Sequence, residues 1–439
     1  MATPRRQAVA VPVATELGVF GLALALVWAP APAVNTKPAP TEAASGDASA
    51  VDAAILGENE EAPKRATVEQ VRAKLTFYDQ YGRGYQSKAG PAQGPGSERL
   101  QVVQPAASLT IRQRNQAISH TLTTVFDVVS AASPDALDAV SQASRYNEAG
   151  TLDVTTAIDT SDRDTLSFRY GVHVEEHWRT GFGGIGYSGS FNEENTVVST
   201  SINVIVDYFD DLHPRGWNDE QTYRLALNDN LSLVQVLSPT TIAMLSYGIT
   251  YQQGTLENGW NSIYIADAPT YGCFDSPDQR AEYDCVNRRR ENLPRKRIRH
   301  AIAAQLGQHL PRSRTTLKAR YRHYRDDFKL RAHTVDAWAY QWLGRRMYLR
   351  AGYRFHRQRG NDFWRRSVLQ STPTDSFFTA DSDLARFDAH QPSIKAVVYL
   401  RPPQAASGGA SSFDIGFSRY IRTNDLHANV FSLGYAQTF

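Results

Sequence analysis

The sequence predicts an all-β protein, a transmembrane antiparallel β-barrel of about sixteen strands with long outer loops and short periplasmic turns. Three observations carry this prediction: sixteen strand-like segments, connections that alternate in length, and a last segment that ends on an aromatic residue. In a barrel the last strand pairs with the first, so every backbone polar group has a partner inside lipid. Two irregular connections leave fourteen strands as an alternative.

The N-terminal region reads as an export signal. Arg5 and Arg6 precede the apolar run Leu17–Trp28, which small residues and prolines follow. The run is shorter than the roughly twenty residues of a membrane helix, and no similar run occurs elsewhere. The next residues are mostly Ala, Pro, Glu, Ser and Thr and cannot bury a core. The predicted organisation is a cleaved signal peptide at 1–33, a disordered leader at 34–66 and a barrel at 67–439.

The strand-like segments show period-two alternation or enrichment in β-branched and aromatic residues. Charged residues make up 21% and aromatic residues 10% of the chain, which suits alternating strands around a wet lumen. The predicted strands are Val71–Gln80, Leu100–Arg112, Ala117–Val129, Leu152–Asp159, Thr165–Glu176, Gly184–Phe191, Thr196–Tyr208, Tyr223–Leu237, Thr241–Gln253, Ile298–Gln308, Thr315–Phe328, Arg331–Trp342, Arg346–Gln358, His390–Arg401, Ser412–Ile421 and His427–Phe439.

The connections favour an outer-membrane barrel, where long loops face outside and short turns face the periplasm. The connections predicted to be long are Tyr81–Arg99, Ser130–Thr151, His177–Gly183, Asp210–Thr222, Gly254–Arg297 and Arg359–Ala389. Short connections lie between them. The very short outer turn at Asp326–Lys329 and the longer periplasmic segment Pro402–Ser411 break the rule.

The two faces of the predicted strands differ in chemistry. Leu166, Phe168, Tyr170, Val172 and Val174 alternate with Ser167, Arg169, Gly171, His173 and Glu175, which predicts lipid on the first face and the lumen on the second. The same alternation puts Lys318, Arg320, Arg322, Arg350 and Arg354 in the lumen, where they form a candidate basic wall that favours anions. The alternative is that they pair with carboxylates such as Glu175, Asp326 and Asp327 in a closed lumen.

The last strand carries Phe431, Leu433, Tyr435 and Phe439 on one face, interrupted by Gln437. This ending resembles the C-terminal assembly signal of bacterial outer-membrane barrels, although the usual pattern has an apolar residue where this chain has Gln437. The resemblance implies the barrel-assembly machinery as a partner. We therefore expect the protein in the cell outer membrane of a Gram-negative bacterium.

The cysteines and a nearby arginine-rich stretch mark one outer loop. Cys273 and Cys285 are the only cysteines, and in an oxidising compartment they predict a disulfide, with free thiols as the alternative. The stretch Arg288–Arg297 could contact lipopolysaccharide phosphates, or could be a solvated base of the loop.

Two stretches resemble a bacterial family of predicted outer-membrane barrels catalogued as domain of unknown function 3570. They are Phe126–Asp135 followed by Ser141–Arg145, and Tyr321–Phe328 followed by Ala332–Thr334. The family usually has glycine where this chain has Ala131 and Gln142. The resemblance implies a barrel and its location, but no activity. In the first stretch, Ser130, Ser133, Ser141, Ser144 and Arg145 could fold into the lumen and meet a ligand, or form a packed outer turn.

The sequence favours porin-like passage of small polar or anionic solutes. The alternatives are a non-conducting scaffold or partner of an exported system, and a barrel enzyme acting on lipid. We predict no catalytic, cofactor or metal site, because histidines such as His173 and His356 are scattered and no nucleophile spacing is recognisable. With 47 basic and 45 acidic side chains, nothing points to nucleic acid. Expected partners are outer-membrane lipid, lipopolysaccharide and small polar solutes.

Overall fold

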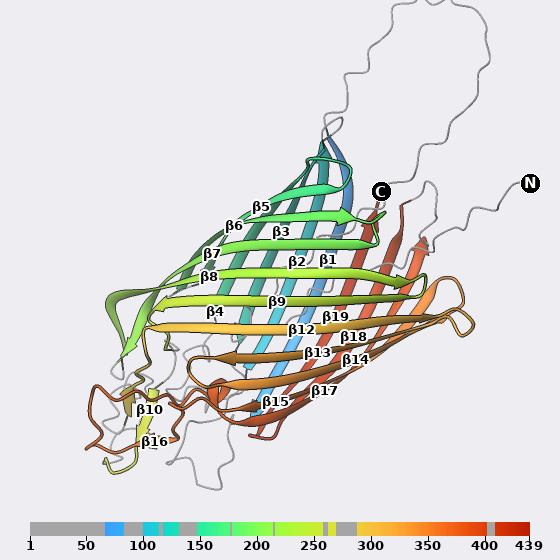
Figure 1. Ribbon diagram of the computed structural model, residues 1–439. Coiled ribbons are helices and arrows are strands. Elements are labelled where there is room, and N and C mark those ends of the chain that lie inside the picture. The colour runs from blue at the N-terminus through green and yellow to red at the C-terminus, as the bar shows by residue number, and fades with distance from the viewer. Residues whose placement is uncertain are drawn as a thin grey trace, which may run out of the picture.

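The computed structural model describes residues 66–82, 100–113, 117–130, 147–175, 178–213, 216–257, 262–268, 288–401 and 409–439. Sixteen antiparallel strands close into one barrel (Figure 1). They are β1 (Ala66–Gly82), β2 (Leu100–Gln113), β3 (Ile118–Ser130), β4 (Asn147–Asp159), β5 (Asp164–Glu175), β6 (Trp178–Phe191), β7 (Thr196–His213), β8 (Gly216–Ser238), β9 (Thr241–Gly254), β12 (Lys296–Leu310), β13 (Thr315–Asp326), β14 (Arg331–Leu343), β15 (Met347–Arg359), β17 (Phe387–Arg401), β18 (Ser411–Arg422) and β19 (Leu426–Thr438). The sixteen-strand prediction is confirmed, and the fourteen-strand alternative is wrong.

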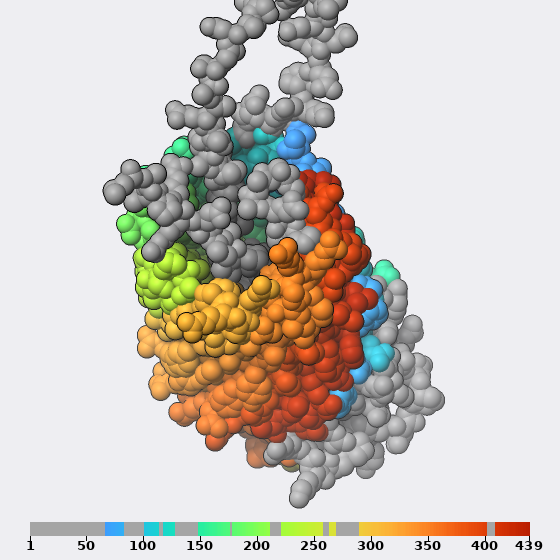
Figure 2. All heavy atoms as spheres, turned by 90° about the vertical axis from the view of Figure 1, so that its right-hand side faces the viewer, coloured from blue at the N-terminus to red at the C-terminus, as the bar shows by residue number. Residues whose placement is uncertain are grey.

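The barrel closes between its first and last strands. β1 pairs with β19 in antiparallel register, with Leu75 opposite Leu433 and Phe77 opposite Phe431. Figure 2 shows the end of the barrel where the short turns lie, with the blue of β1 beside the red of β19. Closure removes the free sheet edges, so the backbone has no unpaired row of polar groups to expose to lipid.

The alternation of side chains around the wall follows the prediction. On β5 the outward residues Phe168, Tyr170, Val172 and Val174 are 38%, 53%, 50% and 53% exposed. Similar outward aliphatic and aromatic residues recur on the other barrel strands, including Leu231, Leu245, Ile302 and Ile415. Side chains this apolar would not face water in such number, so the band faces lipid.

Two connections that the sequence predicted to be long loops are hairpins instead. β5 and β6 are separated only by residues 176–177, so the predicted loop His177–Gly183 is wrong. The predicted loop Asp210–Thr222 is wrong as well, because β7 extends to His213 and β8 begins at Gly216, directly opposite it. Beyond the apolar band both faces of a hairpin meet water, so polar residues there do not end the strands.

Two long outer connections combine into a small sheet that the sequence analysis missed. β10 (Ser262–Ile265) pairs with β11 (Arg288–Arg290) and with β16 (Ser367–Val368) at the end of the barrel away from the C-terminus (Figure 1). Its core contains Ile263, Val368 and Phe378. The one helical element in the described ranges is a 3-10 turn, Ser382–Leu384, and no helix there is long and apolar enough to cross a membrane.

Candidate functional site

The basic wall predicted from the sequence lies on the lumen face of two strands that share a neighbour. Lys318, Arg320 and Arg322 lie on β13, Arg350 and Arg354 lie on β15, and β14 runs between them. All five alternate with outward apolar or aromatic residues, which orients them inward. The strand register places Arg320 directly opposite Asp336, and Asp336 directly opposite Arg354. The wall is therefore contiguous across three strands.

A single carboxylate holds the centre of the basic wall. Oδ2 of Asp336 accepts hydrogen bonds from Nε and Nη2 of Arg320 at 2.9 and 2.7 Å, and its Oδ1 accepts one from Nε of Arg354 at 2.6 Å. Asp336 is only 1% exposed. Two guanidinium groups thus share one negative charge, which leaves this level of the wall with a net positive charge.

The carboxylates predicted from the sequence as partners of the wall have other contacts. Asp326 instead pairs with Arg297, and Asp327 accepts a hydrogen bond from the backbone N–H of Ile298 at 3.0 Å. Glu175 lies on β5, where its carboxylate is 3.7 Å from His173. The strand alternation of β14 could have found Asp336, because Val335 and Ala337 on either side of it face outward.

Aromatic rings contact the basic wall on its side toward the short turns. The guanidinium of Arg320 lies 5.5 Å from the Trp338 ring, and the ammonium of Lys318 lies 5.2 Å from the Tyr340 ring. Trp338 fits because Gly352 is opposite it: a Cβ there would lie 2.8 Å from Cδ1 of Trp338. These contacts hold the charged groups over π faces, which attract cations.

A cluster of four aromatic rings on β14, β15 and β17 lies between the charged groups and the short turns. Trp342 stacks on Tyr399 with centroids 5.9 Å apart, and Tyr348 lies 5.3 Å from Trp342 and 6.2 Å from Tyr340. The register places these side chains on the lumen face, in line with Arg350. One stripe of the lumen thus passes from arginines to flat aromatic faces.

Toward the outer end, the wall connects to an outer loop. Arg322 is opposite Thr334, whose hydroxyl is 2.9 Å from Nδ1 of His356. Nε2 of His356 is 3.3 Å from Oε1 of Gln358, and Nε2 of Gln358 donates to the carbonyl oxygens of Asp383 and Ala385 at 2.6 and 2.7 Å. Polar contacts thus run from the outer loop to Thr334, the residue opposite Arg322 in the strand register.

The positive charge extends along the strands next to the wall. Lys395 on β17 forms an ion pair with Asp414 on β18 at 3.0 Å, and Arg72 and Lys74 lie on the lumen face of β1. On these strands Asp336 and Asp414 lie among the cations of the lumen face, and Glu69 on β1 pairs with Arg112 on β2. This half of the lumen is therefore strongly cationic.

The other half of the lumen has a different composition. In the strand order, β5 stands eight positions from β15 in the ring of sixteen, so the two lie across the barrel from each other. Hydroxyl groups and glycines are frequent on this side, and its arginines have partners: Arg169 donates to Asp153 and Arg224 donates to Asp207, both at 2.8 Å. The lumen is electrically asymmetric, with the net positive charge on one side.

The other predicted sites have different outcomes. Ser130 ends β3, whereas Ser133, Ser141, Ser144 and Arg145 lie outside the described residues, as do Cys273, Cys285, the predicted signal peptide and the predicted leader up to residue 65. Arg288–Arg290 of the arginine-rich stretch form β11, where Arg289 donates to the carbonyl of Thr372 at 2.9 Å. Phe431, Leu433 and Phe439 are exposed on the lipid side, and Tyr435 packs against Phe413.

The histidines do not form a recognisable reaction centre in the described part of the chain. Their hydroxyl partners there are threonines and tyrosines, as in His173 with Thr151 at 2.8 Å and His333 with Tyr321 at 2.7 Å. Among the described residues, no group of three His, Cys, Asp or Glu side chains is arranged to hold a metal ion.

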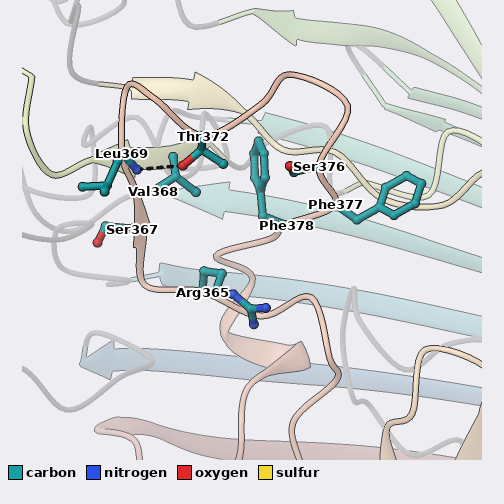
Figure 3. Close-up of a pocket in the computed structure, with 8 residues that line it drawn as sticks. All are labelled: Arg365, Ser367, Val368, Leu369, Thr372, Ser376, Phe377 and Phe378. Atoms are coloured by element: carbon teal, nitrogen blue, oxygen red, sulfur yellow. Dashed lines mark hydrogen bonds between the residues drawn. The ribbon is translucent and has the colours of Figure 1, made fainter.

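A pocket of about 370 Å³ lies in the outer loop between β15 and β17. Figure 3 shows its lining, including Arg365, Phe377 and Phe378 and the hydrogen bond from the Leu369 N–H to Oγ1 of Thr372 at 3.1 Å. Arg365 donates to the carbonyl oxygens of Asp362 and Trp364. Since its one charged group is bound to the backbone, this pocket is a weaker candidate than the lumen wall.

Comparison with known families identifies the chain. The sequence pattern of a family described as "Protein of unknown function (DUF3570)" matches residues 22–422. The chain belongs to this family. This confirms the resemblance found in the sequence, and the closed barrel with its outward apolar band makes this member an outer-membrane barrel.

No curated protein matches the chain. Similar solved structures include a BenF-like porin from Pseudomonas fluorescens Pf-5, with 8% identity, 86% of this chain and 99% of that chain covered, and a TM-score of 0.42. A FadL homologue from Pseudomonas aeruginosa has 10% identity, 86% and 91% coverage and a TM-score of 0.39. OpdK from Pseudomonas aeruginosa, solved with vanillate, has 9% identity, 83% and 98% coverage and a TM-score of 0.36. The likenesses are distant, and the barrel assignment rests on the strand order of this chain.

Proposed function

We propose that this barrel passes small anionic solutes across the outer membrane along its basic wall. The observation that carries the proposal is the shared carboxylate: Arg320 and Arg354 both bind Asp336, while Lys318, Arg322 and Arg350 add positive charge on the same two strands. A wall with this excess of fixed positive charge lowers the free energy of an anion in the lumen and raises that of a cation.

The opposite side of the lumen supports passage rather than tight binding. Its charged groups are largely paired, and hydroxyl groups such as Ser188 and Ser199, 3.0 Å apart, can exchange hydrogen bonds with a moving hydrated solute. Conduction needs binding that is favourable enough for entry and weak enough for release. One attractive wall facing a side whose arginines are paired supports both conditions.

The aromatic cluster below the wall narrows the solute class. Trp342, Tyr348 and Tyr399 offer flat faces in the same stripe as the arginines. A carboxylate that carries a planar apolar group can contact an arginine with its charged end and stack on these rings with the other. We propose that such carboxylates are preferred over inorganic anions.

Single-channel recording tests the proposal. The full-length protein is reconstituted in planar bilayers, and its chloride-to-potassium permeability ratio is compared with that of a variant with Lys318→Gln, Arg322→Gln and Arg350→Gln. These changes leave Asp336 and its two arginines intact. We expect an anion-selective channel whose permeability ratio falls toward one in the triple variant.

A matched control removes three exposed arginines at the short turns, with Arg312→Gln, Arg345→Gln and Arg346→Gln. It should keep the wild-type selectivity, because these groups lie outside the lumen wall. A folded barrel that does not conduct, or one whose selectivity is the same in both triple variants, would contradict the proposal. A silent barrel would favour the scaffold or enzyme alternative.

A further inference from the structure

The outward face of the wall from β9 to β17 carries a polar belt at the outer end of the apolar band. Three tyrosine–histidine pairs mark its lower edge: Tyr247 with His300 at 2.8 Å, Tyr321 with His333 at 2.7 Å, and Tyr353 with His390 at 2.6 Å, from each hydroxyl to Nδ1. The tyrosines are 42%, 46% and 45% exposed. Tyrosines at this level form the aromatic girdle that sits at the membrane–water boundary.

Three arginines lie side by side just beyond this girdle. Arg325 on β13 is directly opposite Arg331 on β14, and Arg331 is directly opposite Arg359 on β15. We call these three residues the arginine row. All three are exposed, and they continue the outward faces that begin with Tyr321, Val335 and Tyr353. Arg325 lies four residues from Tyr321, or roughly 13 Å along the strand.

The arginine row has no carboxylate partner among the described residues. Arg357, on the same face of β15, forms a two-point ion pair with Asp388 at 3.0 and 2.8 Å, so that carboxylate is engaged. The carboxylate of the turn residue Asp327 accepts a hydrogen bond from the backbone N–H of Ile298. Like charges directly opposite on neighbouring strands are about 5 Å apart at Cβ and destabilise the pairing unless an anion lies between them.

We propose that the arginine row binds phosphate groups of the phosphorylated lipid in the outer leaflet, the lipid A part of lipopolysaccharide. The position supports this occupant, because the row directly follows the band that contacts acyl chains, at the level of the headgroups. The chemistry supports it as well, because arginine presents a planar fork of donors that matches phosphate oxygens. The site lies on the outside of the wall and is independent of solute passage.

The arginine row lies outside the stretch Arg288–Arg297, which the sequence suggested as a contact for lipopolysaccharide phosphates. Arg288–Arg290 form β11 of the small outer sheet, and Arg297 is buried against Asp326. Arg289 and Arg297 are engaged within the protein, whereas the arginine row faces the lipid. The strand pairing collects the row from three separate segments, which no run in the sequence shows.

Native mass spectrometry of the full-length protein in detergent tests the proposal. The protein is titrated with lipid A that carries both phosphates, and separately with lipid A from which the phosphates have been removed. We expect the wild type to prefer the phosphorylated lipid by roughly a hundredfold, from about fivefold for each arginine. The variant with Arg325→Gln, Arg331→Gln and Arg359→Gln should bind both lipids alike.

Three controls make the outcome decisive. The short-turn variant with Arg312→Gln, Arg345→Gln and Arg346→Gln removes the same charge and should keep the preference. A variant with lysine at the three row positions should keep part of it, because it retains the charge without the planar fork. Excess inorganic phosphate should not displace the lipid; displacement would make the row a site for free anions and overturn the lipid assignment.

The proposal is wrong if the glutamine variant of the row retains the wild-type preference, or if the wild type does not distinguish the two lipids. Folding of each variant is checked by its heat-dependent mobility on a gel. Should the triple variant not fold, the single change Arg331→Gln at the centre of the row gives the same test, with a predicted loss of about fivefold.

Discussion

The shared carboxylate at the centre of the basic wall gives the sharpest prediction. In the variant Asp336→Asn, one negative charge disappears while Arg320 and Arg354 stay in place. Asp336 is 1% exposed and accepts three hydrogen bonds from two guanidinium groups. Removing one partner of a buried ion pair costs about 3–5 kcal/mol, because the remaining charge is left uncompensated. We expect a loss of unfolding free energy in this range and a higher anion preference.

Urea unfolding of the refolded barrel in lipid vesicles, followed by tryptophan fluorescence, measures the stability. Asp414→Asn is the comparison: it removes a lumen carboxylate that pairs with Lys395 at 3.0 Å, with both side chains 21% exposed, and that also attracts Lys74 and Arg350. A partly exposed ion pair contributes about 1 kcal/mol or less, so we expect this variant to lose less stability than Asp336→Asn. The double variant Asp336→Asn with Arg354→Gln should regain part of the loss, since it removes one of the two unpaired charges. Equal stability of the Asp336 and Asp414 variants would refute the shared clamp.

The remaining predictions concern the outer loops, the packing of the wall and the exported form. Burial raises the pKa of Glu291 to about 8, with further contributions from Asp381 and others. Between pH 4.5, the ordinary pKa of this group, and about pH 8, Glu291 is protonated in the closed loop sheet and ionised in the opened loop. The stability of the closed sheet therefore falls as the pH rises through this range. Hydrogen exchange of residues 288–292 should show this pH dependence in the wild type and not in Glu291→Gln. Gly352→Ala should destabilise the barrel by about 1–3 kcal/mol in urea unfolding, because the new Cβ would lie 2.5 Å from Oγ of Ser393, whereas Gly307→Ala, with its nearest atoms at 3.8 Å, should cost less. Maleimide labelling of the exported protein should modify Cys273 and Cys285 only after reduction, and labelling without reduction would show free thiols. N-terminal sequencing of the mature protein should begin after the predicted signal peptide 1–33, and a retained N-terminus would contradict cleavage.

The barrel strands could be predicted from the sequence because a strand in this setting is under two constraints at once. The outward face must be apolar to contact lipid, and the inward face is wet, so a period of two persists over many residues, as on β5 and β15. Most connections at the short end span only a few residues, with the segment between Arg401 of β17 and Ser411 of β18 as the exception. The closing pair of β1 and β19 then follows from the need to remove free edges.

The outer end could not be predicted in the same way. β10, β11 and β16 are only four, three and two residues long, and β16 comes from a different connection than β10 and β11. No periodicity can show in so few residues, and their pairing depends on the barrel bringing two loops together. The extended hairpin of β7 and β8 was missed for a related reason: outside the membrane its polar composition resembles that of a loop.

The pairing of the basic wall depended on register, which the sequence leaves open. Alternation alone orients Arg320 and Arg354 inward, but only the alignment of three strands shows that Asp336 lies between them. A shift of β14 by one residue would turn Asp336 toward lipid and leave both arginines without it. The cost of that arrangement helps to fix the register that the structure shows.

One stretch of β13 contributes to both proposed surfaces, because successive residues of a strand face opposite sides of the barrel wall. Arg322 faces the lumen, whereas Arg325, three residues later, faces the membrane boundary. The two proposals therefore predict separable effects: the lumen triple variant should change ion selectivity without changing lipid A preference, and the glutamine variant of the arginine row should do the reverse. Because a one-residue slip would exchange the two faces, finding that either variant changes both properties would refute the register from which both surfaces are derived.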